Sequence, residues 1–249
     1  MGLFQKWFKG SQVQYPPASF SDLQCDMHSH FIPGIDDGAR TLNDSLALIT
    51  AFEQMGFRKV ITTPHVMSDH YRNTSDIILR GLDSIKEEAA KRGLSVSIEA
   101  AAEYYLDYDL EQKLKQEPLL TFGKNYLLFE LSFMNPPDHL FHFCFEAQMK
   151  GYRPVLAHPE RYSYWHRDFE KFETLVEKGV LLQLNLNSLV GYYSPEVRKM
   201  AEKLIQAGLV SFLGSDCHHD GHLRVLEKIP GNNAFNQLIA SGKLLNKSL

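Results

Sequence analysis

The sequence predicts an α/β protein of one domain, in which seven parallel strands close into a distorted (β/α)7, TIM-like barrel. Two observations lead to this prediction. Amphipathic helical patterns alternate with short apolar runs, which is typical of a parallel sheet covered by helices. Six of the seven apolar runs also end on a histidine, an aspartate or a glutamate. Polar side chains are therefore expected at the carboxyl ends of most strands, where α/β enzymes build their sites.

The predicted strands are short and almost continuously apolar, as expected when helices cover one face of a sheet and a core fills the other. The runs with polar ends are LQCDMHSH, KVITTPH, SVSIEAAAE, YLLFE, RPVLAHPE and VSFLGSDCH. The remaining run ends near Asn185 and Asn187, where we expect substrate rather than metal. The expected strands are 23–28, 58–63, 95–102, 126–130, 154–158, 180–186 and 210–215.

The helical segments have recognisable starts and ends. Thr41-Leu-Asn-Asp44 has the form of a capping box, and Ser194 followed by Pro195 has the form of an N-cap with proline at the first helical position. Five helical patterns are each followed by a glycine, which tolerates the left-handed conformation that commonly ends a helix. These glycines are Gly56, Gly93, Gly151, Gly179 and Gly208.

An open doubly wound sheet and a closed barrel both fit this order of elements. In an open sheet the polar site residues cluster at one switch point between two strands. Here six strands contribute polar ends, which favours a ring. No linker rich in glycine, serine or charge divides the rest of the chain, so we expect one domain over residues 23–249.

Residues 1–22 are expected to form an N-terminal extension, set off by the Pro- and Ser-rich stretch from Ser11 to Ser21. Its start, MGLFQKWFKG, lacks the long apolar segment and the small-residue cleavage site of a signal peptide. Myristoylation would need Ser or Thr at position 6, where this chain has Lys6. We prefer a plain extension to a segment that lies on a membrane surface.

The composition excludes several classes of protein. A formal charge of −4 and a pI near 6.3 argue against a nucleic-acid-binding surface. No run of about 18 apolar residues is present, so no transmembrane segment is expected. The three cysteines form no CxxC pair and no even framework, which indicates a reducing compartment, and we expect a cytoplasmic location. The oligomeric state stays open.

Two pairs of candidate metal ligands open and close the predicted barrel. His28 and His30 are two residues apart, so both imidazoles point to the same side of a strand, and Asp216 and His218 repeat this spacing. An HxH pair alone often occurs by chance, but here single candidate ligands end the strands between the two pairs. Cys217 is expected to face away from its neighbours in a structural role.

The number of candidate ligands exceeds what one ion needs. A catalytic metal takes about three protein ligands and keeps a position for water, so a larger set would serve two or three ions. Imidazoles and carboxylates without a thiolate set favour Mn, Fe or Zn in a catalytic rather than a structural site. Either Asp36 or Asp37 is the ligand of the DDG turn. With Asp37 taken from that turn, the candidates are His28, His30, Asp37, His65, Glu103, Glu130, His158, Asp216 and His218.

Closely spaced divalent ions favour hydrolysis of a phosphoester. They lower the pKa of bound water and clamp the attacking and leaving oxygens of a phosphoryl group. Such a site also needs cations on the non-bridging oxygens, and arginine provides a bidentate match. Arg161, three residues after His158, is the first candidate for this role, and Arg40 and Arg224 are the others.

Other phosphatase chemistries fit the sequence poorly. A cysteine nucleophile needs an arginine separated from the Cys by five residues in the same loop. None of the three cysteines has one at this spacing, because Cys25, Cys144 and Cys217 have Phe31, Lys150 and Leu223 there. Asp107-Tyr-Asp109 matches an aspartyl-phosphate DxD pattern but does not end a buried strand, so we expect a solvated turn. Neither GxxxxGK[ST] nor GxGxxG occurs. Four histidines are expected in loops near the site, as candidate substrate donors: His70, His166, His219 and His222.

The ordered set HSHFIPGIDDG, TTPH, AAEYY, FEL, AHPER and GSDCH resembles the polymerase and histidinol phosphatase (PHP) superfamily. Within it, the set is similar to the bacterial manganese-dependent protein-tyrosine phosphatases associated with capsular and exopolysaccharide synthesis. The resemblance runs from about residue 23 to about residue 235. It implies a PHP fold, three divalent metal ions, most simply Mn, and tyrosine-rich tails of membrane-bound bacterial tyrosine kinases as substrates.

The resemblance also implies a role for each ligand. The first ion would be held by His28, His30, Glu103 and Asp216, with Glu103 bridging to the second. Glu130 and His158 would complete the second ion, and Asp37, His65 and His218 would hold the third. Arg161 would bind phosphate. The register after His218 differs from the family pattern, which leaves the role of Arg224 open.

Two other functions compete with a phosphotyrosine phosphatase. One is a small-molecule phosphatase such as a histidinol-phosphate phosphatase, which a comparison of kcat/KM for the two substrates would distinguish. The other is a metal-binding module that docks a kinase without catalysis. The full ligand set favours an enzyme.

Overall fold

The structure is a computed structural model that describes residues 13–249. The first 12 residues of the predicted extension, with Lys6, lie outside the described part of the chain.

The strands form a parallel barrel, as predicted, but two of the seven predicted strands are broken. The second becomes β2 and β3, and the third becomes β4 and β5. Pro64, which has no N–H to donate to a ladder, lies in the first break, and Ala101–Ala102 form the second. The strands are β1 (Cys25–Asp26), β2 (Lys59–Thr62), β3 (His65–Val66), β4 (Ser97–Ala100), β5 (Glu103–Tyr105), β6 (Tyr126–Glu130), β7 (Arg153–Ala157), β8 (Leu181–Asn185) and β9 (Val210–Gly214).

The breaks divide the ring into two sheets whose order follows the chain. One sheet has the order β1-β2-β4 and the other β3-β5-β6-β7-β8-β9, and all the paired strands are parallel. The breaks are adjacent, because the N–H of Ala101 still donates to the carbonyl of Thr62. The prediction of seven unbroken strands was therefore wrong at these two positions, and the prediction of a distorted barrel is confirmed.

A seam between the first and last strands closes the ring. Beyond β1 and β9 the chain is joined by a parallel bridge from Ser29 to Cys217. The N–H of Asp216 donates to the carbonyl of His28 at 2.8 Å, and the N–H of His30 donates to that of Cys217 at 2.9 Å. The two predicted ligand pairs thus lie on opposite sides of this seam.

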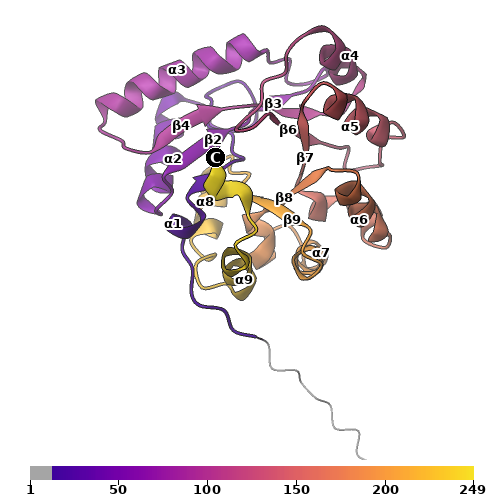
Figure 1. Ribbon diagram of the computed structural model, residues 1–249. Helices are drawn as coiled ribbons and strands as arrows, with labels where there is room; N and C mark the ends of the chain where they lie inside the picture. The colour runs from indigo at the N-terminus through magenta and orange to yellow at the C-terminus, as the bar shows by residue number, and fades with distance from the viewer. Residues whose placement is uncertain (1–12) are drawn as a thin grey trace, which may run out of the picture.

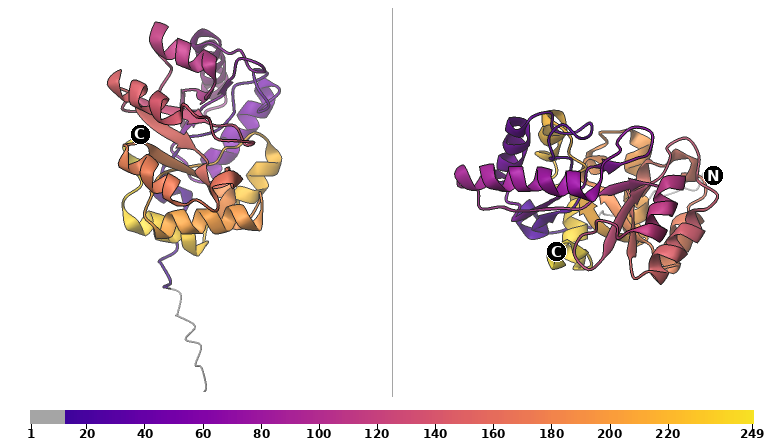
Figure 2. Two further views of the ribbon diagram at one scale, coloured as in Figure 1. Left: turned by 90° about the vertical axis from the view of Figure 1, so that its right-hand side faces the viewer. Right: turned by 90° about the horizontal axis from the view of Figure 1, so that it is seen from above.

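Helices surround the strands (Figures 1 and 2). The capping box at Thr41 and the N-cap at Ser194 are both present, which confirms the two predicted helix starts. All five junction glycines have positive φ, between 70° and 100°, as helix-ending glycines need. The helices are α1 (Phe20–Leu23), α2 (Leu42–Gln54), α3 (Ser75–Lys91), α4 (Tyr108–Gln116), α5 (Leu140–Met149), α6 (Glu170–Glu177), α7 (Pro195–Gln206), α8 (Asp220–Leu226) and α9 (Asn233–Ser241).

Apolar side chains fill both faces of the barrel wall. One cluster lies between the strands and the surrounding helices. A second, smaller cluster fills the barrel interior. There the ring of Phe212 meets those of Tyr126 and Phe122 edge-on, with ring centres 5.0 and 5.8 Å apart. This interior packing leaves polar side chains at the carboxyl ends of the strands.

The C-terminal segment reinforces the seam between β1 and β9. Asn246 belongs to a short 3₁₀ helix, Leu245–Ser248, and is fully buried. Its side-chain N–H groups donate to the carbonyls of Cys25 and Leu213 at 2.9 and 2.7 Å, and its oxygen accepts from the N–H of Leu213 at 3.0 Å. One amide thus joins β1 to β9 where the strands themselves do not pair.

The helix α1 crosses the predicted boundary between the extension and the domain. Phe20 packs in the core and stacks on Phe57 at 4.6 Å. Upstream, the backbone N–H of Ala18 donates to the side chain of Asn236 on α9. The last residues of the predicted extension therefore pack on the domain. Among the described residues, no helix has the length and apolarity that crossing a membrane requires.

Candidate metal centre

The carboxyl ends of the strands surround a cavity of about 460 Å³. Six of the nine predicted ligands line it, and the other three, His28, His30 and Glu103, are fully buried beneath them. The residues that line it are Asp37, His65, Met67, Glu130, Phe133, His158, Arg161, Tyr192, Tyr193, Asp216, His218, His219 and His222.

The HxH pair points to one centre. The Nε2 atoms of His28 and His30 are 3.4 Å apart, and each lies 3.5 Å from Oδ1 of Asp216 across the seam. Their Nδ1 atoms contact other residues. Gln183 Oε1 lies 2.8 Å from Nδ1 of His28, and Asp36 Oδ2 lies 2.8 Å from Nδ1 of His30. Both contacts leave Nε2 available to bind a metal.

The two oxygens of Glu103 face different groups of ligands. Oε2 lies 3.3 Å from His28 Nε2 and 3.2 Å from His65 Nδ1, whereas Oε1 lies 3.1 Å from His158 Nε2. Glu130 reaches the same region, with Oε1 at 3.2 Å from His65 Nδ1. Glu103 comes from β5, the strand that follows the break after β4. The break thus directs the carboxylate of Glu103 towards the middle of the site.

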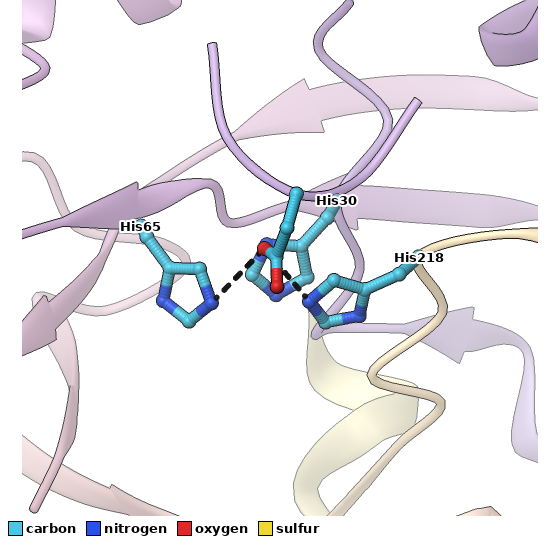
Figure 3. A group of neighbouring side chains, drawn as sticks. His30, His65 and His218 are labelled. Atoms are coloured by element: carbon cyan, nitrogen blue, oxygen red, sulfur yellow. Dashed lines mark ion pairs between the residues drawn. The ribbon is translucent and has the colours of Figure 1, made fainter. Parts of the chain in front are cut away.

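A third group gathers around Asp37. Oδ1 of Asp37 lies 3.5 Å from His65 Nε2 and 3.4 Å from His218 Nε2. Figure 3 shows the imidazoles of His30, His65 and His218 turned towards a common centre, and His30 stacks on His218 at 3.8 Å. Asp36 instead contacts Nδ1 of His30, the ring nitrogen that does not face the other candidate ligands.

The two carboxylate oxygens of Asp216 also have different partners. Oδ1 faces the histidines, while Oδ2 accepts from Asn185 Nδ2 at 2.7 Å and from Arg161 Nη1 at 3.0 Å. Its backbone adopts φ of 51°, in the left-handed region that non-glycine residues seldom occupy. His158 has φ of 35°. Such backbone strain is typical of functional positions.

These contacts shift the pKa values of the buried histidines and carboxylates. Burial opposes a charge on His28, but the carboxylates of Glu103 and Asp216 outweigh it and raise the pKa of His28 to about 9. Burial also opposes a charge on Glu103, but His28 and His65 hold its pKa well below the usual value. The carboxylates are therefore ionised and attract positive charge, which protons or divalent ions can supply.

The arrangement fits divalent ions. Donor atoms bound to one ion at about 2.1 Å lie roughly 3.0 to 3.4 Å apart in octahedral or tetrahedral geometry. Most of the separations above fall between 3.1 and 3.5 Å. His65 Nδ1 and Glu103 Oε2 are buried without a hydrogen-bond partner, which a metal bond would satisfy. Donor atoms within 4.8 Å of one another form three groups: His30, Asp37, His65 and His218; His28, His30 and Asp216; and His65, Glu103 and Glu130.

Arg161 is held against the site by two rings and a carboxylate. Its guanidinium lies 4.6 Å from the ring centre of Phe133 and 4.3 Å from that of Tyr193. The hydrogen bond to Asp216 fixes its direction. A quarter of its side chain remains exposed, so it can still contact a molecule in the cavity.

The other predicted arginines lie away from the cavity. Arg224 pairs with Asp220 on the outer surface of α8 and is mostly exposed. Arg40 lines a neighbouring hollow of about 380 Å³ that shares Asp37 and His218 with the cavity. Among the residues that the structure describes around the cavity, Arg161 supplies the one guanidinium.

The predicted loop residues have mixed outcomes. His222 lines the cavity, and burial lowers its pKa to about 4. His219 lines it too but caps α8, and His166 contacts the carbonyl of Glu160. Asn185 contacts Asp216 rather than open space. Asp107 caps α4, so the predicted turn is the start of a helix, although Tyr108 and Asp109 are exposed to solvent as predicted.

The residues that support the proposed ligands were not predicted from the sequence. Gln183 lies inside β8, and the one local signal for it is a polar glutamine between two leucines of an otherwise apolar strand. Asp26 is fully buried, with a pKa that burial raises to about 7, and it accepts from the N–H and hydroxyl of Ser215 at 2.7 and 2.9 Å. Phe133 and Tyr193, which enclose Arg161, carry no local pattern.

A parallel barrel with a cluster of histidines and carboxylates at its carboxyl end defines a metallohydrolase-like class of protein. Residues 24–226 match the family model for capsular polysaccharide synthesis, CpsB/CapC. The chain therefore belongs to the CpsB/CapC family.

Curated relatives match over most of their length. The tyrosine-protein phosphatase YwqE of Bacillus subtilis is 30% identical over 229 residues, covering 88% of this chain and 90% of the relative. The tyrosine-protein phosphatase CpsB of Streptococcus agalactiae serotype V is 29% identical over 200 residues, covering 78% and 82%.

Solved structures agree on the fold. One from the work on YwqE of Bacillus subtilis and CpsB of Streptococcus pneumoniae, described as unique metal-dependent tyrosine phosphatases, has a TM-score of 0.78 and 29% identity, and covers 90% of this chain and 94% of that chain. A histidinol phosphate phosphatase of Lactococcus lactis, with a TM-score of 0.52 and 12% identity, covers 84% and 98% and shares the fold alone.

Proposed function

We propose that this chain is a metal-dependent phosphatase that hydrolyses phosphotyrosine on proteins. The observation that carries the proposal is the meeting of nine histidine and carboxylate side chains, in and beneath a cavity at the carboxyl end of the barrel, beside one fixed arginine. Membership of a family whose curated relatives are named tyrosine-protein phosphatases supports the same substrate.

The proposed cofactors are three divalent ions, with Mn as the native metal. Glu103 is proposed to bridge two of them, because its two oxygens face different histidines. Asp37 rather than Asp36 is the proposed ligand, since Asp36 already contacts Nδ1 of His30. The full proposed set is His28, His30, Asp37, His65, Glu103, Glu130, His158, Asp216 and His218.

The chain's own residues would bind and orient the phosphoryl group. Arg161 would donate to its non-bridging oxygens, and the contact with Asp216 keeps the guanidinium aimed at the cavity. When bound, divalent ions supply charge neutralisation on the phosphoryl oxygens and a lower pKa for water. Asp216 and His218 are the other residues proposed to act at the reacting atoms.

The reaction needs no covalent intermediate on the protein. Water adds to phosphorus as the bond to the tyrosine oxygen breaks, giving inorganic phosphate and a tyrosine hydroxyl. A phenol has a free pKa near 10, so this leaving group needs little help from an acid. The three cysteine thiols are buried and do not line the cavity, which agrees with direct attack by water.

The proposed substrate is the tyrosine-rich tail of a membrane-bound bacterial tyrosine kinase that controls capsular or exopolysaccharide synthesis. A cytoplasmic location follows from that substrate. Arg40, in the hollow beside Asp37, is proposed to contact the substrate protein rather than the phosphoryl group. Arg224 pairs with Asp220 and has no proposed role in phosphate binding.

The deciding experiment measures phosphate release from a phosphotyrosine peptide by the full chain, with Mn²⁺, after chelation, and after Mn²⁺ is restored. We expect activity with Mn²⁺, its loss on chelation and its recovery. Histidinol phosphate serves as the competing substrate. Full activity in the chelated protein, or a higher kcat/KM for histidinol phosphate than for the peptide, would overturn the proposal.

A further inference from the structure

One side of the cavity is lined by flat, π-faced side chains from the segments that follow four successive strands. Phe133 follows β6, Arg161 follows β7, Tyr192 and Tyr193 follow β8, and His222 follows β9. We name these five residues the aromatic wall. The four strands are neighbours in the same sheet, so the wall runs along one continuous part of the barrel rim.

The members of the aromatic wall contact one another in order. Arg161 lies between Phe133 and Tyr193, at 4.6 and 4.3 Å from their ring centres. Tyr193 then meets Tyr192 edge-on at 5.1 Å, and Tyr192 meets His222 edge-on at 5.1 Å. These distances are those of preferred aromatic and cation–π contacts. The wall is therefore one packed surface rather than separate side chains.

Tyr193, in the middle of the wall, is fixed, whereas Phe133 and Tyr192 face solvent. Tyr193 is held by its hydroxyl, which accepts from Asn185 Nδ2 at 3.1 Å. By contrast, Phe133 is 42% exposed and Tyr192 is 43% exposed. Large aromatic groups that line a concave site and stay open to water are typical of ligand-binding surfaces.

The wall stands close to where a phosphoryl group would bind. Phe133 stacks on His158 at 5.5 Å, and His222 meets His218 at 5.5 Å, so both ends of the wall adjoin proposed metal ligands. A group attached to the phosphoryl oxygen would therefore leave the centre alongside the wall. A phenyl ring could stack there, whereas the short side chain of phosphoserine presents no ring to stack.

We propose that the aromatic wall binds the phenyl ring of phosphotyrosine, and that Phe133 and Tyr192 select aryl over alkyl phosphoesters. This inference rests on the proposed function and names the feature of the substrate that the site recognises. Arg161 serves both parts, because its edge faces the phosphoryl group while its face packs in the wall.

The test compares two non-hydrolysable inhibitors of the Mn²⁺-loaded full chain, benzylphosphonate and ethylphosphonate. Both carry the phosphonate group, so their ratio of inhibition constants isolates the ring. We expect Phe133→Ala and Tyr192→Ala each to weaken benzylphosphonate by about 3- to 10-fold, the range of one aromatic contact. Ethylphosphonate should change by less than about twofold, and kcat/KM for a phosphotyrosine peptide should fall with benzylphosphonate affinity.

Two features make the test decisive. Met134→Ala is the matched control, because Met134 adjoins Phe133 but is 86% exposed and does not line the cavity, so it should leave both constants unchanged. Tyr192 makes no contact with Arg161 comparable to that of Phe133, so its variant separates ring binding from displacement of the guanidinium.

The outcomes separate this inference from the proposed function. Equal weakening of both phosphonates, or no change in either, would overturn the role of the wall while leaving phosphotyrosine hydrolysis by the wild-type chain intact. Absence of phosphotyrosine hydrolysis in the wild-type chain would overturn the proposed function and this inference together.

Discussion

Gln183 Oε1 lies 2.8 Å from Nδ1 of His28, and both side chains are fully buried. The amide oxygen can only accept, so Nδ1 of His28 carries the proton and Nε2 is free to bind a metal. The same Gln183 donates to Asn185 at 2.9 Å, which in turn donates to Asp216. One glutamine thus connects ligands on both sides of the barrel seam.

We expect Gln183→Met to weaken metal binding by about 10- to 100-fold, the usual effect of removing a residue that orients a ligand. The Mn²⁺ concentration that gives half-maximal activity reports this change. Gln206→Leu is the control, because Gln206 is exposed at the end of α7. An unchanged Mn²⁺ requirement in Gln183→Met would show that the contact does not orient His28.

The neighbouring aspartates should behave differently when each is changed to asparagine. Asp37→Asn removes a proposed ligand, so we expect loss of one ion per chain and a fall in activity of more than about 100-fold, the order expected when a catalytic metal is lost. Asp36→Asn keeps all ligands but loses the charge beside Nδ1 of His30, so metal affinity should fall about 10- to 100-fold. Metal content by elemental analysis separates the two, and the reverse pattern would reassign the ligand to Asp36.

Metal should stabilise the fold as well as support activity. Ions that bind the native state alone add about 2.7 kcal/mol at 100 times their Kd, which corresponds to roughly 5–11 °C in Tm for a chain of this size. Thermal unfolding with Mn²⁺ and with chelator measures the shift. Glu103→Gln should reduce it sharply, because Glu103 contacts both His28 and His158. Equal Tm values with and without Mn²⁺ in the wild type would contradict a bound metal cluster.

Asn246 should be the most sensitive residue of the C-terminal segment. Asn246→Ala removes three hydrogen bonds and leaves buried carbonyls of Cys25 and Leu213 without their partner. We expect a loss of about 2–4 kcal/mol in the free energy of unfolding. Urea denaturation measures it, with the exposed Asn43→Ala as a control expected to change stability by less than about 0.5 kcal/mol. A loss below about 1 kcal/mol would mean that the seam does not depend on this amide.

The three thiols should be unreactive in the folded protein. Cys25, Cys144 and Cys217 are all buried, and burial raises the pKa of Cys144 to about 12. We expect no labelling by a disulfide reagent until the chain is unfolded, and phosphatase activity that iodoacetamide does not inhibit. Rapid labelling of one thiol with parallel loss of activity would point instead to a cysteine nucleophile.

Much of the fold followed from local patterns. The alternation of apolar strands and amphipathic helices predicted the parallel order, and the two-residue period predicted that His28 and His30 share one side. The breaks at Pro64 and at Ala101–Ala102 were harder to predict than the order of the strands. Apolar alanines continue through the second break, which depends on pairing with the neighbouring strand.

The parts of the site that escaped prediction depend on tertiary contacts. Asp36 and Asp37 are adjacent in sequence, and only the turn of the chain decides which faces the histidines. Arg224 was a candidate because of its position after His218, but the helix α8 places it beside Asp220 on the surface. Gln183 and Asn246 act across the barrel on residues far away in sequence.

The seam between β1 and β9 has a consequence for when this protein becomes active. His28 and His30 follow the first strand of the barrel, whereas Asp216 and His218 follow the last. A proposed ion held by both pairs would join the two ends of the ring. During synthesis, the cluster cannot assemble until the final strand has left the ribosome. An incomplete chain therefore lacks part of the ligand set, and hydrolysis is withheld until the barrel is whole.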